Sequence, residues 1–76
     1  MSIELETLRR AALSWARADR VASDRDADLE RADTARITNE ERRPILAAWR
    51  AAGQVEGKAL EEFHEAARRL LAATEI

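Results

Sequence analysis

The sequence predicts an all-α fold, an antiparallel hairpin of two long helices. Apolar residues recur at three- and four-residue steps through most of the chain, which is the spacing of one helix face. Residues 2–43 contain neither glycine nor proline, so nothing in that half interrupts a helix. The 76 residues make one domain at most, and at this size a lone core supplies only ~3–5 kcal/mol.

The first helix is expected over residues 2–37. Ser2 supplies an N-cap, and Glu4 follows in the first turn, where the helix dipole favours acids. A seam of the coiled-coil type repeats at steps of seven: Met1, Leu8, Trp15, Ala22 and Leu29. Beyond its middle the helix becomes polar, and Ser23 with Asp26 resembles a capping box. We favour one continuous helix, and a break near Ser23 is the alternative.

A turn is expected at residues 38–43. Thr38 followed by Glu41 matches a capping box, which would begin a helix there. That helix would enclose Pro44, which lacks an N–H donor and crowds the preceding turn. We therefore expect Pro44 at the first position of the second helix, where proline fits well.

The second helix is expected over residues 44–74. Its apolar stripe consists of Ile45, Leu46, Trp49, Ala52, Leu60, Phe63, Ala67 and Leu70. Gly53 and Gly57 lie inside it, and each costs up to ~1 kcal/mol relative to alanine. They either divide the segment, giving three helices, or allow another backbone to approach closely. We favour an unbroken helix, because the stripe keeps its phase from Trp49 to Leu60.

Two helices joined near residue 40 would place residues opposite each other when their numbers sum to about 80. Trp15 would then meet Phe63, and Leu29 would meet Trp49. The residues expected at the core or interface are Leu8, Trp15, Leu29, Ile45, Trp49, Leu60, Phe63 and Leu70. Several large apolar residues lie off this seam: Ile3, Leu13, Val21 and Val55. They predict that the hairpin dimerises, most simply into a four-helix bundle.

Charge and composition indicate a cytoplasmic protein. The net charge is −2 with both signs evenly spread, so the basic patch that attracts nucleic acid or a membrane surface is missing from the sequence. No signal peptide or membrane span is expected. The absence of cysteine fits a reducing compartment. Twelve arginines beside one lysine, with 17 alanines, suggest a GC-rich bacterial or phage genome.

Glu61 and His64 form the one pattern that hints at metal chemistry. A Glu-x-x-His pair on a helix resembles part of the ligand set of di-iron carboxylate bundles. We favour a solvated histidine beside Glu65 and expect no cofactor; a metal-binding four-helix bundle that uses Glu61 and His64 is the further alternative. The sequence has no cysteine nucleophile and no glycine-rich phosphate loop, so we do not expect an enzyme.

Asp19, Asp26 and Asp33 repeat every seven residues beside the seam of the first helix. Such a ladder could dock a basic partner, or pair across the hairpin with Arg43, Arg50 and Lys58. A solvated helix flank has the same pattern and is the interpretation that we favour.

These features together predict a small, non-enzymatic interaction or assembly module that associates with itself and with another protein. The alternative is a small DNA-linked regulator or antitoxin, with helices 44–52 and 55–74 forming a turn motif around Gly53. The length and hairpin pattern resemble the small helical-hairpin secretion substrates, which carry a Trp-x-Gly turn. Here Trp49 is four residues from Gly53 and neither lies at the expected turn, so nothing is transferred from that resemblance.

Overall fold

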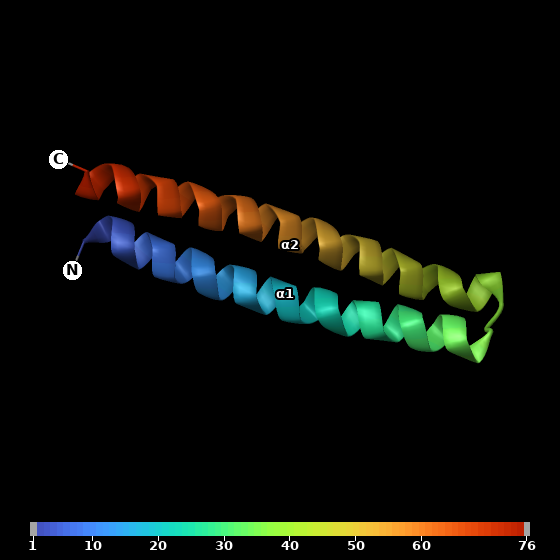
Figure 1. The fold of residues 1–76 in the computed structure, drawn as a ribbon. Coiled ribbons are helices and arrows are strands. Elements are labelled where there is room, and N and C mark those ends of the chain that lie inside the picture. The colour runs from blue at the N-terminus through green and yellow to red at the C-terminus, as the bar shows by residue number, and fades with distance from the viewer. Residues whose placement is uncertain (1, 76) are drawn as a thin grey trace.

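The protein is a hairpin of two long helices. The computed structural model describes residues 2–75, so Met1 of the expected seam lies outside the described residues. Helix α1 spans Ile3–Ala35 and helix α2 spans Asn39–Thr74. They run antiparallel and side by side, with both termini at one end and the turn at the other (Figure 1). The Cα atoms extend over 58 × 14 × 13 Å, and the predicted all-α hairpin is confirmed.

Helix α1 is continuous, so the alternative break near Ser23 is wrong. Its start follows the expected chemistry, because the Ser2 hydroxyl accepts a hydrogen bond from the Leu5 amide at 3.1 Å. The helix ends at Ala35, two residues earlier than expected. Arg36 takes a left-handed conformation with φ 54°, and its amide donates to the Asp33 carbonyl at 3.3 Å, which closes the last turn.

The second helix begins at Asn39, not at the expected residue 44. The Glu41 amide donates to the Thr38 hydroxyl at 3.2 Å, and the Thr38 amide donates to the Glu41 carboxylate at 3.4 Å. This capping box satisfies two amides that would otherwise lack partners at the helix start. Pro44 therefore lies inside the first two turns of α2, where its missing N–H removes one backbone hydrogen bond.

Helix α2 also runs unbroken through Gly53 and Gly57, so the three-helix alternative is wrong. The turn motif around Gly53 that a DNA-binding regulator would need is absent from the described residues for the same reason. A Cβ atom built on either glycine would meet nothing within 4 Å. Within one hairpin, the glycines consequently do not serve a close approach of α1.

A line of alanines separates the two helices. Among the described residues, the buried side chains are Ala18, Ala32, Ala52, Ala59 and Ala66. They stand at seven-residue steps or multiples of seven in each helix, because that spacing returns to nearly the same side of an α-helix. Larger side chains flank this line rather than fill it. The predicted core is therefore displaced to the edges of the contact between α1 and α2.

Candidate functional site

The hairpin has two broad faces, one on each side of the alanine line. Trp15 precedes Ala18 by three residues and Val21 follows it by three, so they leave the line in opposite directions. In α2, Val55 precedes Ala59 by four residues and Phe63 follows it by four, so these two side chains also leave the line in opposite directions. We call the first side the aromatic face: Leu8, Trp15, Leu29, Trp49, Leu60, Phe63 and Leu70. We call the second side the groove face: Ser14, Ala18, Val21, Ala48, Ala51 and Val55.

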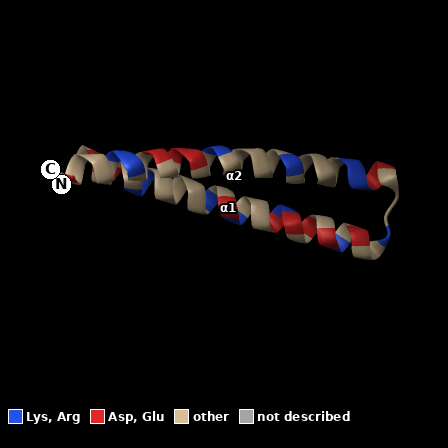
Figure 2. Ribbon diagram, turned by 45° about the horizontal axis from the view of Figure 1, so that its top comes forward, with Lys and Arg blue, Asp and Glu red and all other residues tan. Residues whose placement is uncertain are grey.

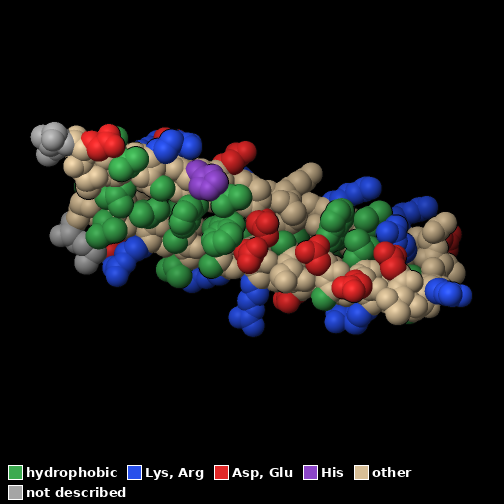
Figure 3. Space-filling model, viewed as in Figure 1, with side chains coloured by type: hydrophobic (Ala, Val, Ile, Leu, Met, Phe, Trp, Pro, Cys, Tyr) green, Lys and Arg blue, Asp and Glu red, His purple; other side chains and the backbone are tan. Residues whose placement is uncertain are grey.

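On the aromatic face, rings from both helices touch. The Trp15 and Phe63 ring centroids lie 6.0 Å apart with the planes tilted by 53°, and Phe63 meets His64 edge-on at 6.2 Å. Figure 3 looks onto this face, where hydrophobic side chains gather over the half that holds the termini. Trp49 lies toward the turn, and its indole N–H donates to the Asp26 carboxylate. The aromatic face thus combines a ring contact nearer the termini with a polar contact nearer the turn.

The residues expected at the core or interface remain partly open to solvent. Trp49 is 37% exposed, and the others are half-buried: Leu8, Trp15, Leu29, Ile45, Leu60, Phe63 and Leu70. Among the described residues no large side chain is fully buried. Contacts within the hairpin therefore cover part of each side chain and leave the rest available.

The observed pairs fix the register between the helices. Trp15 faces Phe63, Asp26 bonds Trp49, and Asp33 binds Arg42. The residue numbers in these pairs sum to 78, 75 and 75. The register is a few residues short of the expected 80, because α2 starts at Asn39 and the turn is correspondingly earlier.

Three carboxylates cross the middle of the aromatic face: Asp19, Asp26 and Glu56. The pKa of Glu56 is raised above its ordinary value, first because packing removes water from the carboxyl group. The charge of Asp19, a hydrogen bond between the two carboxyl groups and the charge of Asp26 raise it further. Within residues 2–75 none of the three takes part in an ion pair. We call them the acidic cluster, and in Figure 3 red side chains lie across the middle of this face.

Asp33, the third member of the predicted ladder, behaves differently. Its carboxylate binds the Arg42 guanidinium at 2.7 Å, and this hydrogen bond and charge raise the pKa of Arg42. The cross-hairpin partner is Arg42 rather than any of the cations expected from the sequence: Arg43, Arg50 and Lys58. In Figure 2 acidic segments gather in the part of α1 nearer the turn. The ladder is therefore engaged at Asp33 and left without a cation at Asp19 and Asp26.

The groove face is lined by small side chains between basic ones. Its central hollow is bordered by Ala18, Val21, Ala48, Ala51 and Val55, with Arg17 and Arg25 at its edge. Val21 is 48% exposed and Val55 is 60% exposed, so this apolar floor is open. Lys58 lies seven residues from Ala51 and thus on the same side of α2.

The three cations on this side, Arg17, Arg25 and Lys58, differ in their ion pairs. Arg25 binds Asp28 at 2.8 Å. Arg17 and Lys58 make no ion pair with another described residue. We call Arg17, Arg25 and Lys58 the basic rim.

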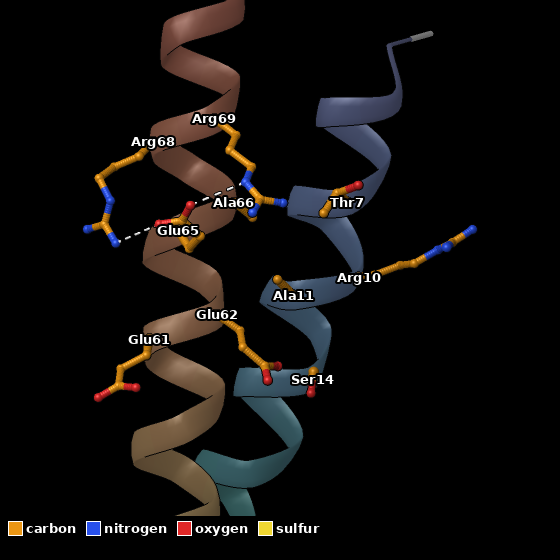
Figure 4. A pocket seen from close by; sticks show the side chains of 10 residues that line it. All are labelled: Thr7, Arg10, Ala11, Ser14, Glu61, Glu62, Glu65, Ala66, Arg68 and Arg69. Atoms are coloured by element: carbon orange, nitrogen blue, oxygen red, sulfur yellow. Dashed lines mark hydrogen bonds and ion pairs between the residues drawn. The ribbon is translucent and has the colours of Figure 1, made fainter.

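Toward the termini the groove face changes character. Thr7, Ala11 and Ser14 of α1 lie opposite Glu62 and Arg69 of α2, while Arg10 points outward (Figure 4). Glu65 binds Arg68 at 3.0 Å and Arg69 at 3.2 Å, and these contacts lower the pKa of Glu65. In this section Glu65 therefore compensates part of the positive charge of its own helix.

Glu61 and His64 do not converge. Both side chains are exposed; Glu61 points away from α1 in Figure 4, whereas His64 lies against the edge of Phe63. The described part of the chain holds no group of three or more side chains able to bind a metal. Within one hairpin, Glu61 and His64 therefore do not form a metal-binding site.

Two features of the site were not foreseen from the sequence. Glu56 was overlooked, although it occupies the seven-residue repeat of α2 that also contains Trp49, Phe63 and Leu70. The alanine floor of the groove face was overlooked because alanine carries little weight in an apolar stripe. A search for seven-residue repeats in both helices, irrespective of residue type, would have found both.

Comparison with family models, curated proteins and solved structures finds no match. Within the described residues, no helix combines the length and apolar character needed to cross a bilayer. The two faces of the hairpin are therefore the features that bear on its function.

Proposed function

We propose that the chain is a non-enzymatic assembly module, which associates with copies of itself and presents the resulting helical bundle to another protein. The support is the pattern of burial. The helices bury only alanines between them among the described residues, while both faces keep large apolar side chains partly exposed. Side chains of this size are normally covered when a helical bundle is complete.

The hairpin exposes more surface than a globular monomer of the same mass. The chain exposes 6104 Å², whereas a globular monomer of its 8.6 kDa mass exposes about 4,700 Å². The difference is roughly 1,400 Å², and a standard interface buries about 800 Å² on each partner. One standard interface would cover a little over half of this difference, and interfaces on both faces would cover about all of it. This surplus is the observation that carries the proposal.

The proposal places the module in the cytoplasm, in keeping with the absence of cysteine from the sequence. We do not assign nucleic acid or a membrane as its partner. The net charge is −2, and the basic rim consists of three cations, so the chain does not offer the extended positive surface that those partners require.

Thermal unfolding at different protein concentrations tests the proposal. If the folded state is an oligomer, a hundredfold dilution lowers its stability by about 2.7 kcal/mol for a dimer, and the melting temperature falls by several degrees. Circular dichroism follows the melting, and light scattering measures the mass at each concentration. A monomer mass throughout, with a melting temperature unaffected by dilution, would contradict self-association.

A further inference from the structure

We propose that copies of this chain stack front to back, with the aromatic face of one copy seated on the groove face of the next. This inference rests on the proposed self-association and specifies its geometry. It is carried by three properties of the two faces: their shape, their charge and the position of that charge along the hairpin.

The shapes of the faces complement each other. The aromatic face presents the rings of Trp15, Phe63 and Trp49, all of them incompletely covered. The groove face offers a floor of alanine and valine with an open hollow between the helices. Large side chains entering a surface of small ones is the arrangement that close helix packing favours. Two faces of large rings, or two open hollows, would fit less well.

The charges of the faces also complement each other. The acidic cluster of Asp19, Asp26 and Glu56 lies on the aromatic face and has no cation within the described chain. On the opposite face, the basic rim contains Arg17 and Lys58, which have no anion there. Opposite charges brought together across an interface favour encounter and fix its register.

Both charged groups lie at the same level of the hairpin. The register places Lys58 and Glu56 beside the part of α1 that holds Arg17 and Asp19. This level is near the middle of α1, which spans Ile3–Ala35. Two copies stacked with full overlap therefore bring the acidic cluster of one against the basic rim of the other.

A symmetric dimer meets an electrostatic obstacle. A two-fold axis brings the same face of each copy together, and a feature near the middle then faces its own duplicate. A dimer formed through the aromatic faces would bring two acidic clusters together, and a dimer formed through the groove faces would bring two basic rims together. Both arrangements are unfavourable. Front-to-back contact avoids both, and its repetition gives a ring or an open stack.

Reversing the charges on one face at a time tests this geometry. The front variant carries Asp19→Lys and Glu56→Lys, and the back variant carries Arg17→Glu and Lys58→Glu. Sedimentation of the full chain over a range of concentrations measures association, and circular dichroism checks that the helices persist. We expect the concentration at half-association to rise by at least about tenfold for each variant, because like charges then meet across the interface.

A combined variant with all four changes carries a basic front and an acidic back. Front-to-back stacking then regains complementary charge, and association should return toward that of the unchanged chain. A matched control, Arg20→Glu with Arg50→Glu, alters charge by the same amount as the back variant. Those positions lie on the sides of the helices remote from the alanine line, and association should be unaffected.

The outcomes separate the geometry from the proposed function. If the unchanged chain is a monomer at every concentration, self-association itself fails. If it associates, but one of the two single-face variants associates equally well, the interface is a symmetric one on the other face and the stacking geometry is overturned. Failure of the combined variant to recover, with its helices intact, would overturn it as well.

Discussion

Glu56 is the residue whose surroundings most oppose its charge. Packing removes water from its carboxyl group, and Asp19 and Asp26 place two further negative charges nearby. The pKa in the folded chain is therefore higher than in the unfolded chain. The folded state binds this proton more tightly, so the ionised group lowers stability as the pH rises through the raised pKa.

The variant Glu56→Gln should consequently melt at a higher temperature than the unchanged chain at neutral pH. The difference should vanish below the ordinary glutamate pKa of about 4.3, where the carboxyl group is protonated in both states. Thermal melting of both chains between acidic and neutral pH measures it.

Glu65 provides a control of opposite sign. Its pKa is lowered by Arg68 and Arg69, so its favourable contribution exists at neutral pH and is lost as the pH falls. Glu65→Gln should therefore melt lower at neutral pH and converge with the unchanged chain in acid. If both variants shifted the melting temperature in the same direction at neutral pH, the assignment of Glu56 would be wrong.

Gly53 permits a second test at a single residue. It lies in a continuous helix, and a Cβ atom there would meet nothing within 4 Å. Gly53→Ala should raise the free energy of unfolding by about 1 kcal/mol, because alanine loses less backbone freedom in a helix. Urea unfolding measures the gain, and Gly57→Ala should behave alike. A loss of stability would mean that another chain approaches Gly53 closely in the assembly.

Among the elements, the start of α2 shows two local preferences in competition. The capping box at Thr38 and Glu41 supplies partners for helix amides, whereas Pro44 removes one hydrogen bond further along. The ion pair between Asp33 and Arg42 also joins this first turn to α1 at 2.7 Å. The box and this tertiary contact together outweigh the unfavourable position of the proline.

Thr38→Ala should therefore lower the free energy of unfolding by about 1 kcal/mol. Urea unfolding monitored by circular dichroism gives the difference. Thr34→Ala, in the exposed last turn of α1, is the matched control and should change stability by less than about 0.5 kcal/mol. An equal effect of the two substitutions would show that the box contributes nothing particular.

The sequence predicts the number and direction of the helices because periodicity extends over many turns. Trp15 and Phe63 meet as expected, since the phase of the apolar stripe survives the error at the turn. The boundary at residues 38–43 was mispredicted because a capping box and a proline give contrary local signals. Which of them prevails depends on contacts such as Asp33 with Arg42, which a sequence pattern does not contain.

At the scale of the whole molecule, the candidate site was less accessible to sequence reasoning than the fold. The acidic ladder was identified on α1, but Glu56 joins it only through the pairing of the two helices. The groove face requires Ala48, Val55 and Val21 to border one hollow, which depends on the register. That register follows the turn, and an error of a few residues there changes which polar residues meet across the hairpin, as it did for Asp33 and Arg42.

The alanine line has a mechanical consequence. Since no large side chain is fully buried between the helices in the described part of the chain, many small contacts along the hairpin resist the separation of α1 from α2. A contact between α1 and α2 beside the three-residue turn closes a short loop of chain, so it re-forms quickly after it breaks. A contact near the termini closes a loop of nearly the whole chain and re-forms more slowly. The helices of an isolated hairpin should thus separate first near the termini and last near the turn. A neighbouring copy packed across the middle of the hairpin would oppose this separation.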